Sequence, residues 1–362
     1  MLEAVFAWWW LGIIEIVVFA GLIGLVALKA DKIVGDAPRS LAALRAGMGF
    51  TVLAMIGAYL VVIALALWLV EAYAGLSAEQ LALVAAALAA LMIIVQWLFS
   101  PYIINAVYRA RPPGPGEEWL VKDLEELARR SGMKTPKLMI AEVEMPNAFA
   151  YGSPIAGSYV AVTRGLLRLL PRDEVRAVLA HELGHLKHRD VSVILALSLL
   201  PAAAYFIGRG LVWLGILGGG DGERRSSSPL VLAAVGVALL AAGFLFELAV
   251  AHFNRLREYY ADAHSAIVTG QPRLLQRALA RLHLAYQGNP HLKAEAEEKG
   301  LAAMLFIVAP LVELSGGFFY DIDYAVEQLK REKASPLMEL FSTHPPIPKR
   351  LRFLDRLAMG FR

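Results

Sequence analysis

Long apolar segments dominate the hydrophobic pattern of this chain. A helix needs roughly 20 apolar residues to cross a hydrocarbon core about 30 Å thick. Five stretches meet that requirement, and they run approximately from Trp8 to Leu28, Gly47 to Val70, Leu81 to Ile104, Val191 to Leu217 and Pro229 to Ala251. The first stretch has no basic residues before it and is too long for a signal peptide, so we expect a retained anchor. The pattern therefore predicts a polytopic membrane protein embedded in the lipid bilayer.

Basic residues in the short loops predict how these spans are oriented, because loops rich in Lys and Arg are held in the cytoplasm. The loop after the first span carries four such residues, residues 71–80 carry none, and the segment after the third span begins with Arg109 and Arg111. We therefore predict a multi-pass plasma-membrane protein with its N-terminus outside and residues 108–190 on the cytoplasmic side.

The remaining sequence alternates between helical and strand patterns. Apolar residues at helical spacing predict an amphipathic helix from Gly116 to Ser131, a helix after Pro171 and a final helix from roughly Pro346 to Met359. Between the first two helices, Lys137 to Glu142 and Ser158 to Thr163 are short and rich in apolar or β-branched residues. These two segments predict strands of a small sheet, separated by turn residues.

Composition supports this division and restricts the chemistry. A mean hydropathy of +0.55 excludes an ordinary soluble globule. The net charge of +3 comes from basic residues scattered beside hydrophobic segments, so nucleic acid is not an expected partner. The chain has no cysteine, so any metal must be held by histidine and carboxylate.

The main chemical motif is His181-Glu182-Leu183-Gly184-His185, which matches the pattern HExxH inside the helix predicted after Pro171. A helix advances 3.6 residues per turn, so the two histidines project from one face and can bind one zinc ion. Glu182 then lies beside the metal as the general base toward water. The alternative is a basic helix face at a membrane surface, which is the interpretation we prefer for His188.

A catalytic zinc usually has three protein ligands, and Glu258 is the best candidate for the third. His185 lies just before the fourth span and Glu258 just after the fifth, so a two-span hairpin returns both residues to the same membrane face. Asp262 lies one helical turn further, where its carboxylate can orient a ligand histidine. The alternative is an exposed helix with Arg and Glu pairs.

The expected fold class is mainly α, with polytopic membrane helices and a small α+β domain. Four regions are expected along the chain. They are an N-terminal membrane region with three spans (1–107), a cytoplasmic catalytic part with the sheet and the HExxH helix (108–190), a two-span hairpin (191–251), and a cytoplasmic catalytic part with the third ligand and the C-terminal helices (252–362).

The combination of HELGH on a helix, two hydrophobic segments and then RLREYYADAHSA resembles the membrane zinc metallopeptidase family that contains the heat-shock protease HtpX and the CaaX prenyl proteases. The resemblance covers roughly Leu120 to Leu354. It implies a zinc peptidase domain of the gluzincin type with one Zn²⁺ per chain. The implied roles are zinc ligands for His181, His185 and Glu258, catalytic base for Glu182, and support of a ligand for Asp262.

Two further segments resemble the same family. The segment Met145 to Ala150 resembles an edge strand that binds substrate backbone by strand addition, which implies substrate contacts for Asn147, Ala148, Phe149 and Ala150. The segment Ser342-Thr343-His344-Pro345-Pro346 with Arg350 resembles a THPP segment, which implies that His344 donates to the oxyanion of the tetrahedral intermediate and that Arg350 contacts substrate.

These observations predict a zinc-dependent endopeptidase that cleaves membrane or misfolded proteins at the cytoplasmic face. The family resemblance implies that this activity serves protein quality control under stress. Two alternatives stay open at this point. One is a CaaX-type processing protease. The prenyl-substrate proteases of this family resemble a closed chamber of seven spans, and five spans are too few to enclose one. The other is a non-catalytic membrane scaffold or holdase that retains zinc. Oligomeric state has no signature in the sequence.

Overall fold

The computed structural model describes residues 97–188, 190–217, 229–288 and 321–360, together with 37–38, 40–51 and positions 21, 22, 28, 53, 54, 57, 91, 94 and 95. The predicted spans from Trp8 to Leu28, Gly47 to Val70 and Leu81 to Ile104 lie wholly or largely outside these residues. Of the five predicted spans, the described residues include in full or nearly so only the last two.

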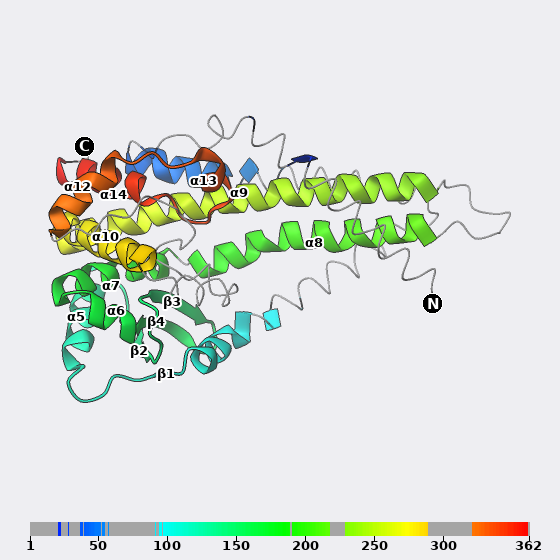
Figure 1. Cartoon of the computed structure of the whole chain (residues 1–362). Coiled ribbons are helices and arrows are strands. Elements are labelled where there is room, and N and C mark those ends of the chain that lie inside the picture. The colour runs from blue at the N-terminus through cyan, green and yellow to red at the C-terminus, as the bar shows by residue number, and fades with distance from the viewer. Residues whose placement is uncertain are drawn as a thin grey trace. The chain divides into compact units, whose positions relative to one another are not determined.

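The described chain is mainly helical with one small sheet (Figure 1). A short helix, Trp97–Val107, precedes the sheet. The elements that follow are β1 (Ala110–Arg111), α5 (Glu118–Arg130), β2 (Lys137–Ala141), β3 (Ala148–Ser153), β4 (Gly157–Thr163), α6 (Arg164–Leu169), α7 (Arg172–Lys187), α8 (Asp190–Leu217), α9 (Pro229–Thr269), α10 (Pro272–Gly288), α12 (Ile322–Arg331), α13 (Pro336–Phe341) and α14 (Ile347–Ala358).

The chain divides into two compact units. The first contains Met1–Ile33, Gly49–Val95 and Ile194–Val250, and the second contains Val34–Met48, Gln96–Val193 and Ala251–Arg362. The first unit therefore holds most of α8 and the N-terminal half of α9. The second unit holds the sheet, the remaining helices and the C-terminal half of α9.

The sheet of the second unit has the strand order β1-β2-β4-β3, with β2 and β4 parallel and the other pairs antiparallel. Alternate residues of each strand enter different apolar clusters. In β2, Leu138 and Ile140 join the larger cluster, whereas Met139 and Ala141 join a smaller one on the opposite face. Both faces are thus buried, which explains why these strands are nearly continuous apolar runs.

The larger cluster joins the sheet to the helices of the second unit. Helix α7 contributes Val175, Val178, Leu179 and Leu183, and further residues come from α5, α10, α12 and α14. Asp173 and Glu174 occupy the first turn of α7, where the helix dipole favours negative charge. The HExxH helix is therefore held on a rigid core by its apolar residues.

In the first unit, α8 and α9 form the predicted antiparallel hairpin. Gly243 approaches Ala204, and Gly208 approaches Leu239, so contacts that advance along α8 recede along α9. The closest point is Gly236, where an added Cβ would lie 2.5 Å from the Gly208 carbonyl oxygen. Small residues allow this approach, as in helix pairs within membranes. Among the described residues, one segment, Val231–Thr269, is long and apolar enough to cross a membrane.

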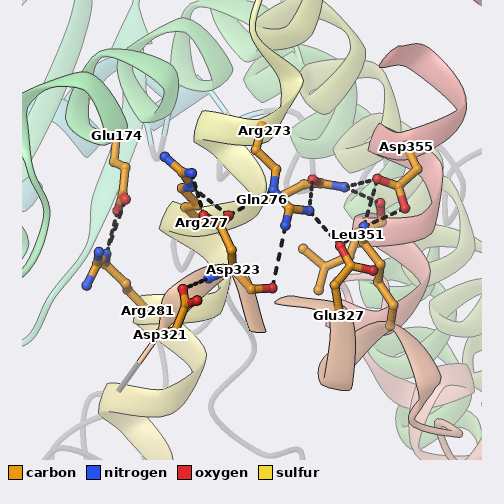
Figure 2. Close-up of polar contacts among 11 residues, drawn as sticks. Glu174, Arg273, Gln276, Arg277, Arg281, Asp321, Asp323, Glu327, Leu351 and Asp355 are labelled. Carbon is orange, nitrogen blue, oxygen red and sulfur yellow. Dashed lines mark hydrogen bonds and ion pairs between the residues drawn. The ribbon is translucent and has the colours of Figure 1, made fainter. Parts of the chain in front are cut away.

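Ion pairs attach the C-terminal helices to α10 (Figure 2). Asp323 of α12 accepts hydrogen bonds from Arg273 and Arg277, and Gln276 donates to the Leu351 carbonyl of α14 at 2.7 Å. Arg281, further along α10, pairs with Glu174 of α7 at 2.9 Å. Helix α10 thus connects the HExxH helix to α12 and α14.

Outside the long apolar segments, the predicted helices and strands are present, and the structure contains further elements that were not predicted. The predicted helices correspond to α5, α7 and α14, and the two predicted strands to β2 and β4. The interval between these strands, where the residue pattern predicted only turns, also contains β3. Its position at the end of the strand order makes it an edge strand, as the family resemblance implied for Met145 to Ala150. Helices α6, α10, α12 and α13 were not predicted.

Candidate metal centre

Two helices of the second unit bring the three predicted ligands together. His181 and His185 lie one turn apart on α7, and Glu258 lies on the C-terminal half of α9. One potential ligand atom from each residue lies within 4.8 Å of the others. His181 and Glu258 are buried, with exposed fractions of 1% and 7%. The hairpin argument predicted this juxtaposition of residues that are far apart in the sequence.

The spacing of these atoms fits a single divalent metal ion. The two Nε2 atoms of His181 and His185 are 3.3 Å apart, and Glu258 oxygens lie 3.4 Å from His185 Nε2 and 3.6 Å from His181 Nε2. Tetrahedral coordination with bonds of about 2.0–2.1 Å separates ligand atoms by about 3.4 Å. The Oε2 atom of Glu258 is also buried, accepts no hydrogen bond of good geometry from the described residues, and has the Arg350 guanidinium 3.2 Å away as an ion pair. The donor set therefore suits a divalent metal ion in its chemistry and its spacing.

Asp262 and Arg350 surround the ligands with charge. Asp262 lies 3.0 Å from Nδ1 of His181, the nitrogen that points away from the other ligands. Arg350 donates to Asp262 at 2.6 and 2.9 Å and lies 3.2 Å from Glu258. Both residues are fully buried. This arrangement fixes the His181 ring and holds Glu258 in place, as carboxylates next to metal-binding histidines do.

The electrostatics keep Glu258 ionised. Burial alone raises its pKa, but His344 and Arg350 outweigh that effect and hold the pKa of the Glu258 carboxyl well below its usual range. Burial lowers the pKa of His344 to about 4, so this ring is neutral at pH 7. Arg350 is therefore the cation that stabilises the Glu258 carboxylate at neutral pH.

Glu182 follows His181 on α7 and is buried, with an exposed fraction of 3%. Burial raises its pKa, while the neighbouring His181 and His185 lower it in part. A carboxylate whose protonated form is stabilised is a good proton acceptor. This environment suits the general base that the motif predicts.

The structure also shows where the predicted substrate contacts lie. His344 is buried, and its Nε2 atom is 3.7 Å from Glu258 Oε1, so it joins the centre. Ala148, Phe149 and Ala150 lie on the edge strand β3. The backbone N–H of Asn147 donates to Thr163 Oγ1, and its carbonyl accepts from Thr163 N–H, so these two groups are already used.

The structure places Arg350, for which the resemblance implied a substrate contact, among the residues that surround the ligands. Its exposed fraction is 0%, and its guanidinium is enclosed by Asp262 and Glu258. Arg350 therefore contacts the ligand Glu258 and the Asp262 carboxylate that orients His181. No local pattern in the sequence indicates these contacts, because the two carboxylate partners lie about 90 residues away.

Sequence reasoning also missed two contacts around the ligands. Arg257 lies beside His185, with its Nη2 atom 3.4 Å from His185 Nδ1. Ser265, further along α9, donates to the Ala177 carbonyl of α7 at 2.7 Å. In the sequence, an arginine next to a glutamate suggests an exposed ion pair. Arg257 is instead buried in the structure.

Gly184, inside the motif, permits the close crossing of α7 and α9. An added Cβ there would lie 3.0 Å from Ala261 Cα and 3.1 Å from His264 Cβ. We expect Gly184→Ala to force the helices apart, to destabilise the protein by about 1–3 kcal/mol and to weaken metal binding. Thermal unfolding and a competitive metal titration measure both effects.

Gly210→Ala in α8 is the matched control, because nothing lies within 4 Å of its added Cβ. Replacing a helical glycine with alanine at such a site is neutral or stabilising. Equal stability of the two variants would contradict the packing explanation.

Two histidines one turn apart, a glutamate between them and a carboxylate from a distant helix as the third ligand define a metallopeptidase centre. Residues 116–358 match the model of peptidase family M48, and the chain belongs to this family, whose members include HtpX-like metalloproteases. A protease HtpX homologue of Aeropyrum pernix is 68% identical over 86% of this chain and 97% of its own length.

Two other comparisons are more distant. Protease HtpX homolog 2 of Saccharolobus solfataricus is 41% identical over 73% of this chain and 82% of its own length. The crystal structure of S. mikatae Ste24p covers 88% of this chain and 68% of its own, with a TM-score of 0.48 and 17% identity. The latter similarity is too low to bear on function.

Proposed function

We propose that this metalloprotease is a zinc-dependent endopeptidase anchored in a membrane, and that it hydrolyses peptide bonds of membrane or misfolded proteins at the cytoplasmic face. The observation that carries the proposal is the meeting of His181, His185 and Glu258 at distances that suit one tetrahedral ion, with Glu182 beside them. Borderline ions such as zinc favour this set of two imidazoles and one carboxylate.

His181, His185 and Glu258 hold the zinc ion in this proposal. When bound, zinc polarises the scissile carbonyl and lowers the pKa of water toward neutrality. Glu182 accepts the proton of the attacking water and later returns it to the leaving amine. His344 donates from Nε2 to the oxyanion of the tetrahedral intermediate. Asp262 keeps the His181 ring oriented.

Substrate backbone adds to the sheet at β3 in this proposal. An edge strand offers unpaired N–H and C=O groups, and a peptide that pairs with them lies extended. Strand β3 also contacts α7, the helix of the HExxH motif. Main-chain pairing recognises any unfolded segment regardless of its sequence, which suits a quality-control protease.

The membrane part of the proposal rests on hydropathy. Residues 1–107 and 191–251 supply the spans, and residues 108–190 and 252–362 supply the cytoplasmic catalytic parts. The apolar character of α9 ends near Asn254, four residues before Glu258. This change in polarity supports a site next to the membrane surface, and the basic loops support a cytoplasmic orientation with the N-terminus outside.

Removal of the metal tests this function. The purified protein in detergent should cleave unfolded β-casein, lose cleavage when treated with a zinc chelator, and regain it on addition of stoichiometric Zn²⁺. Gel electrophoresis and mass spectrometry of the fragments measure the outcome. Cleavage that survives complete removal of metal would refute a metal-dependent peptidase, and a chelator-insensitive ability to keep casein soluble without fragments would indicate a holdase.

A further inference from the structure

Arg255 is a buried arginine on α9 to which neither the motif nor the ligand set assigns a function. Its exposed fraction is 3%. Its Nη1 atom lies 2.9, 3.2 and 2.7 Å from the carbonyl oxygens of Glu339, Leu340 and Ser342. These carbonyls belong to the last turn of α13 and to the residue that caps it. One guanidinium thus fastens the end of α13 to α9.

The chemistry of a helix end explains why this contact is strong. The last carbonyls of a helix have no partner within the helix, and they carry partial negative charge. A buried arginine satisfies several of them at once and fixes where the following residues begin. A glutamine at position 255 is uncharged and shorter than arginine, so it would leave these carbonyls without the donor that reaches them.

The residues fixed in this way lead directly to His344. The Ser342 hydroxyl donates to the His344 carbonyl at 2.9 Å and accepts from the His344 N–H at 3.2 Å. The Thr343 hydroxyl lies 3.0 Å from His344 Nδ1. Arg255 binds the carbonyl of Ser342, and the Ser342 hydroxyl in turn binds the backbone of His344 two residues later. Arg255 therefore helps to fix the position of His344.

A second contact holds the chain on the C-terminal side of His344. Arg350 of α14 forms ion pairs with Asp262 and Glu258 of α9. Positions 255, 258 and 262 are spaced i, i+3 and i+7, so they share one face of α9. His344 lies between the two contacts, with Nε2 facing Glu258. The same helix face thus carries a metal ligand and both attachment points for the His344 segment.

We propose that Arg255 is a positioning residue for peptide hydrolysis, which holds the Ser342 to His344 segment so that the imidazole of His344 meets the oxyanion beside Glu258. This inference rests on the proposed function, because it presumes that His344 acts in the reaction. It adds a residue that touches neither metal nor substrate and acts only through His344.

A double-mutant cycle separates positioning from general structural support. The variants are Arg255→Gln, His344→Ala and the double variant, each assayed with a quenched-fluorescence peptide that carries a sequence cut from casein by the wild type. We expect Arg255→Gln to lower kcat by on the order of 10- to 10²-fold with little change in KM, because misplacement of one group costs that much. His344→Ala should cost on the order of 10²-fold in kcat.

The test is whether the effect of Arg255→Gln on kcat depends on the presence of His344. In the His344→Ala background, the Arg255→Gln change should cost less than about twofold, because the group that it positions is absent. A further loss as large as in the wild-type background would overturn the inference while leaving the proposed function intact. Absence of chelator-sensitive cleavage by the wild type would instead overturn the proposed function.

Three controls keep the result independent of folding. Bound zinc, measured by elemental analysis, should be unchanged in Arg255→Gln, and amide hydrogen exchange should rise in residues 341–344 only. Arg255→Lys keeps the charge and should restore part of kcat. Arg356→Gln is the matched control, because Arg356 also donates to backbone carbonyls, those of Ala37 and Pro38, and it should leave kcat unchanged. A loss of kcat in Arg356→Gln equal to that in Arg255→Gln would overturn the inference.

Discussion

Glu182→Gln is expected to abolish proteolysis while the protein keeps its metal. The variant retains the shape and burial of the side chain but cannot accept the proton of the attacking water. General acid–base catalysis contributes on the order of 10²- to 10⁴-fold, so kcat for casein or a peptide should fall by about 10³-fold. Elemental analysis should show the same zinc content as the wild type, because His181, His185 and Glu258 are unchanged.

The same variant has a second expected effect, on stability. Burial raises the pKa of Glu182, so ionisation of this side chain costs more free energy in the folded state than in the unfolded chain. Glutamine removes this penalty. The melting temperature of the metal-free protein at pH 7 should therefore be equal or higher in Glu182→Gln. Full activity in this variant would refute the assignment of the base, and loss of zinc together with activity would show that Glu182 acts as a ligand.

Arg350→Met is expected to have the largest effect on stability. Arg350 is the cation shared by two buried carboxylates, Asp262 and Glu258. Removing one member of a buried ion pair leaves charge without compensation and costs about 3–5 kcal/mol. The metal-free protein should unfold at a markedly lower temperature, and saturating zinc should recover part of the loss, because the ion then neutralises Glu258.

Arg352→Met provides the comparison for this prediction. Arg352 lies on the same helix, is exposed, and donates to the Lys330 carbonyl. Its replacement should change the free energy of unfolding by about 0.5 kcal/mol or less, as surface substitutions do. Similar losses in the two variants, measured by thermal or denaturant unfolding in detergent, would contradict a central electrostatic role for Arg350.

The sequence was sufficient for those parts of the centre that follow from local periodicity. His181, Glu182 and His185 lie within one helical turn, so the 3.6-residue repeat fixes their relative positions before any tertiary structure is known. Glu258 was predictable for another reason. Two apolar segments of similar length form a hairpin, and the polar residues that flank such a hairpin return to the same end of it.

Other parts of the centre depend on contacts that no local pattern records. Arg350 and Arg255 resemble ordinary surface arginines in the sequence, and only the packing of α13 and α14 on α9 buries them. Turn residues at both ends of strand β3 hid it from the periodicity, and the resemblance to a known family implied an edge strand there. The same resemblance identified the segments around Asn147 and His344, whereas the contacts of Arg350 with Asp262 and Glu258 become apparent only in the structure.

The central claim is that His181, His185 and Glu258 hold one zinc ion, and X-ray absorption at the zinc edge tests it most directly. The protein loaded with zinc should contain one ion per chain, with scattering from two imidazoles and lighter oxygen ligands. Glu258→Gln should bind zinc more weakly and lose an oxygen ligand from the spectrum while it keeps both imidazoles. An unchanged spectrum and affinity in Glu258→Gln, or a wild-type spectrum with fewer than two imidazoles, would contradict the account.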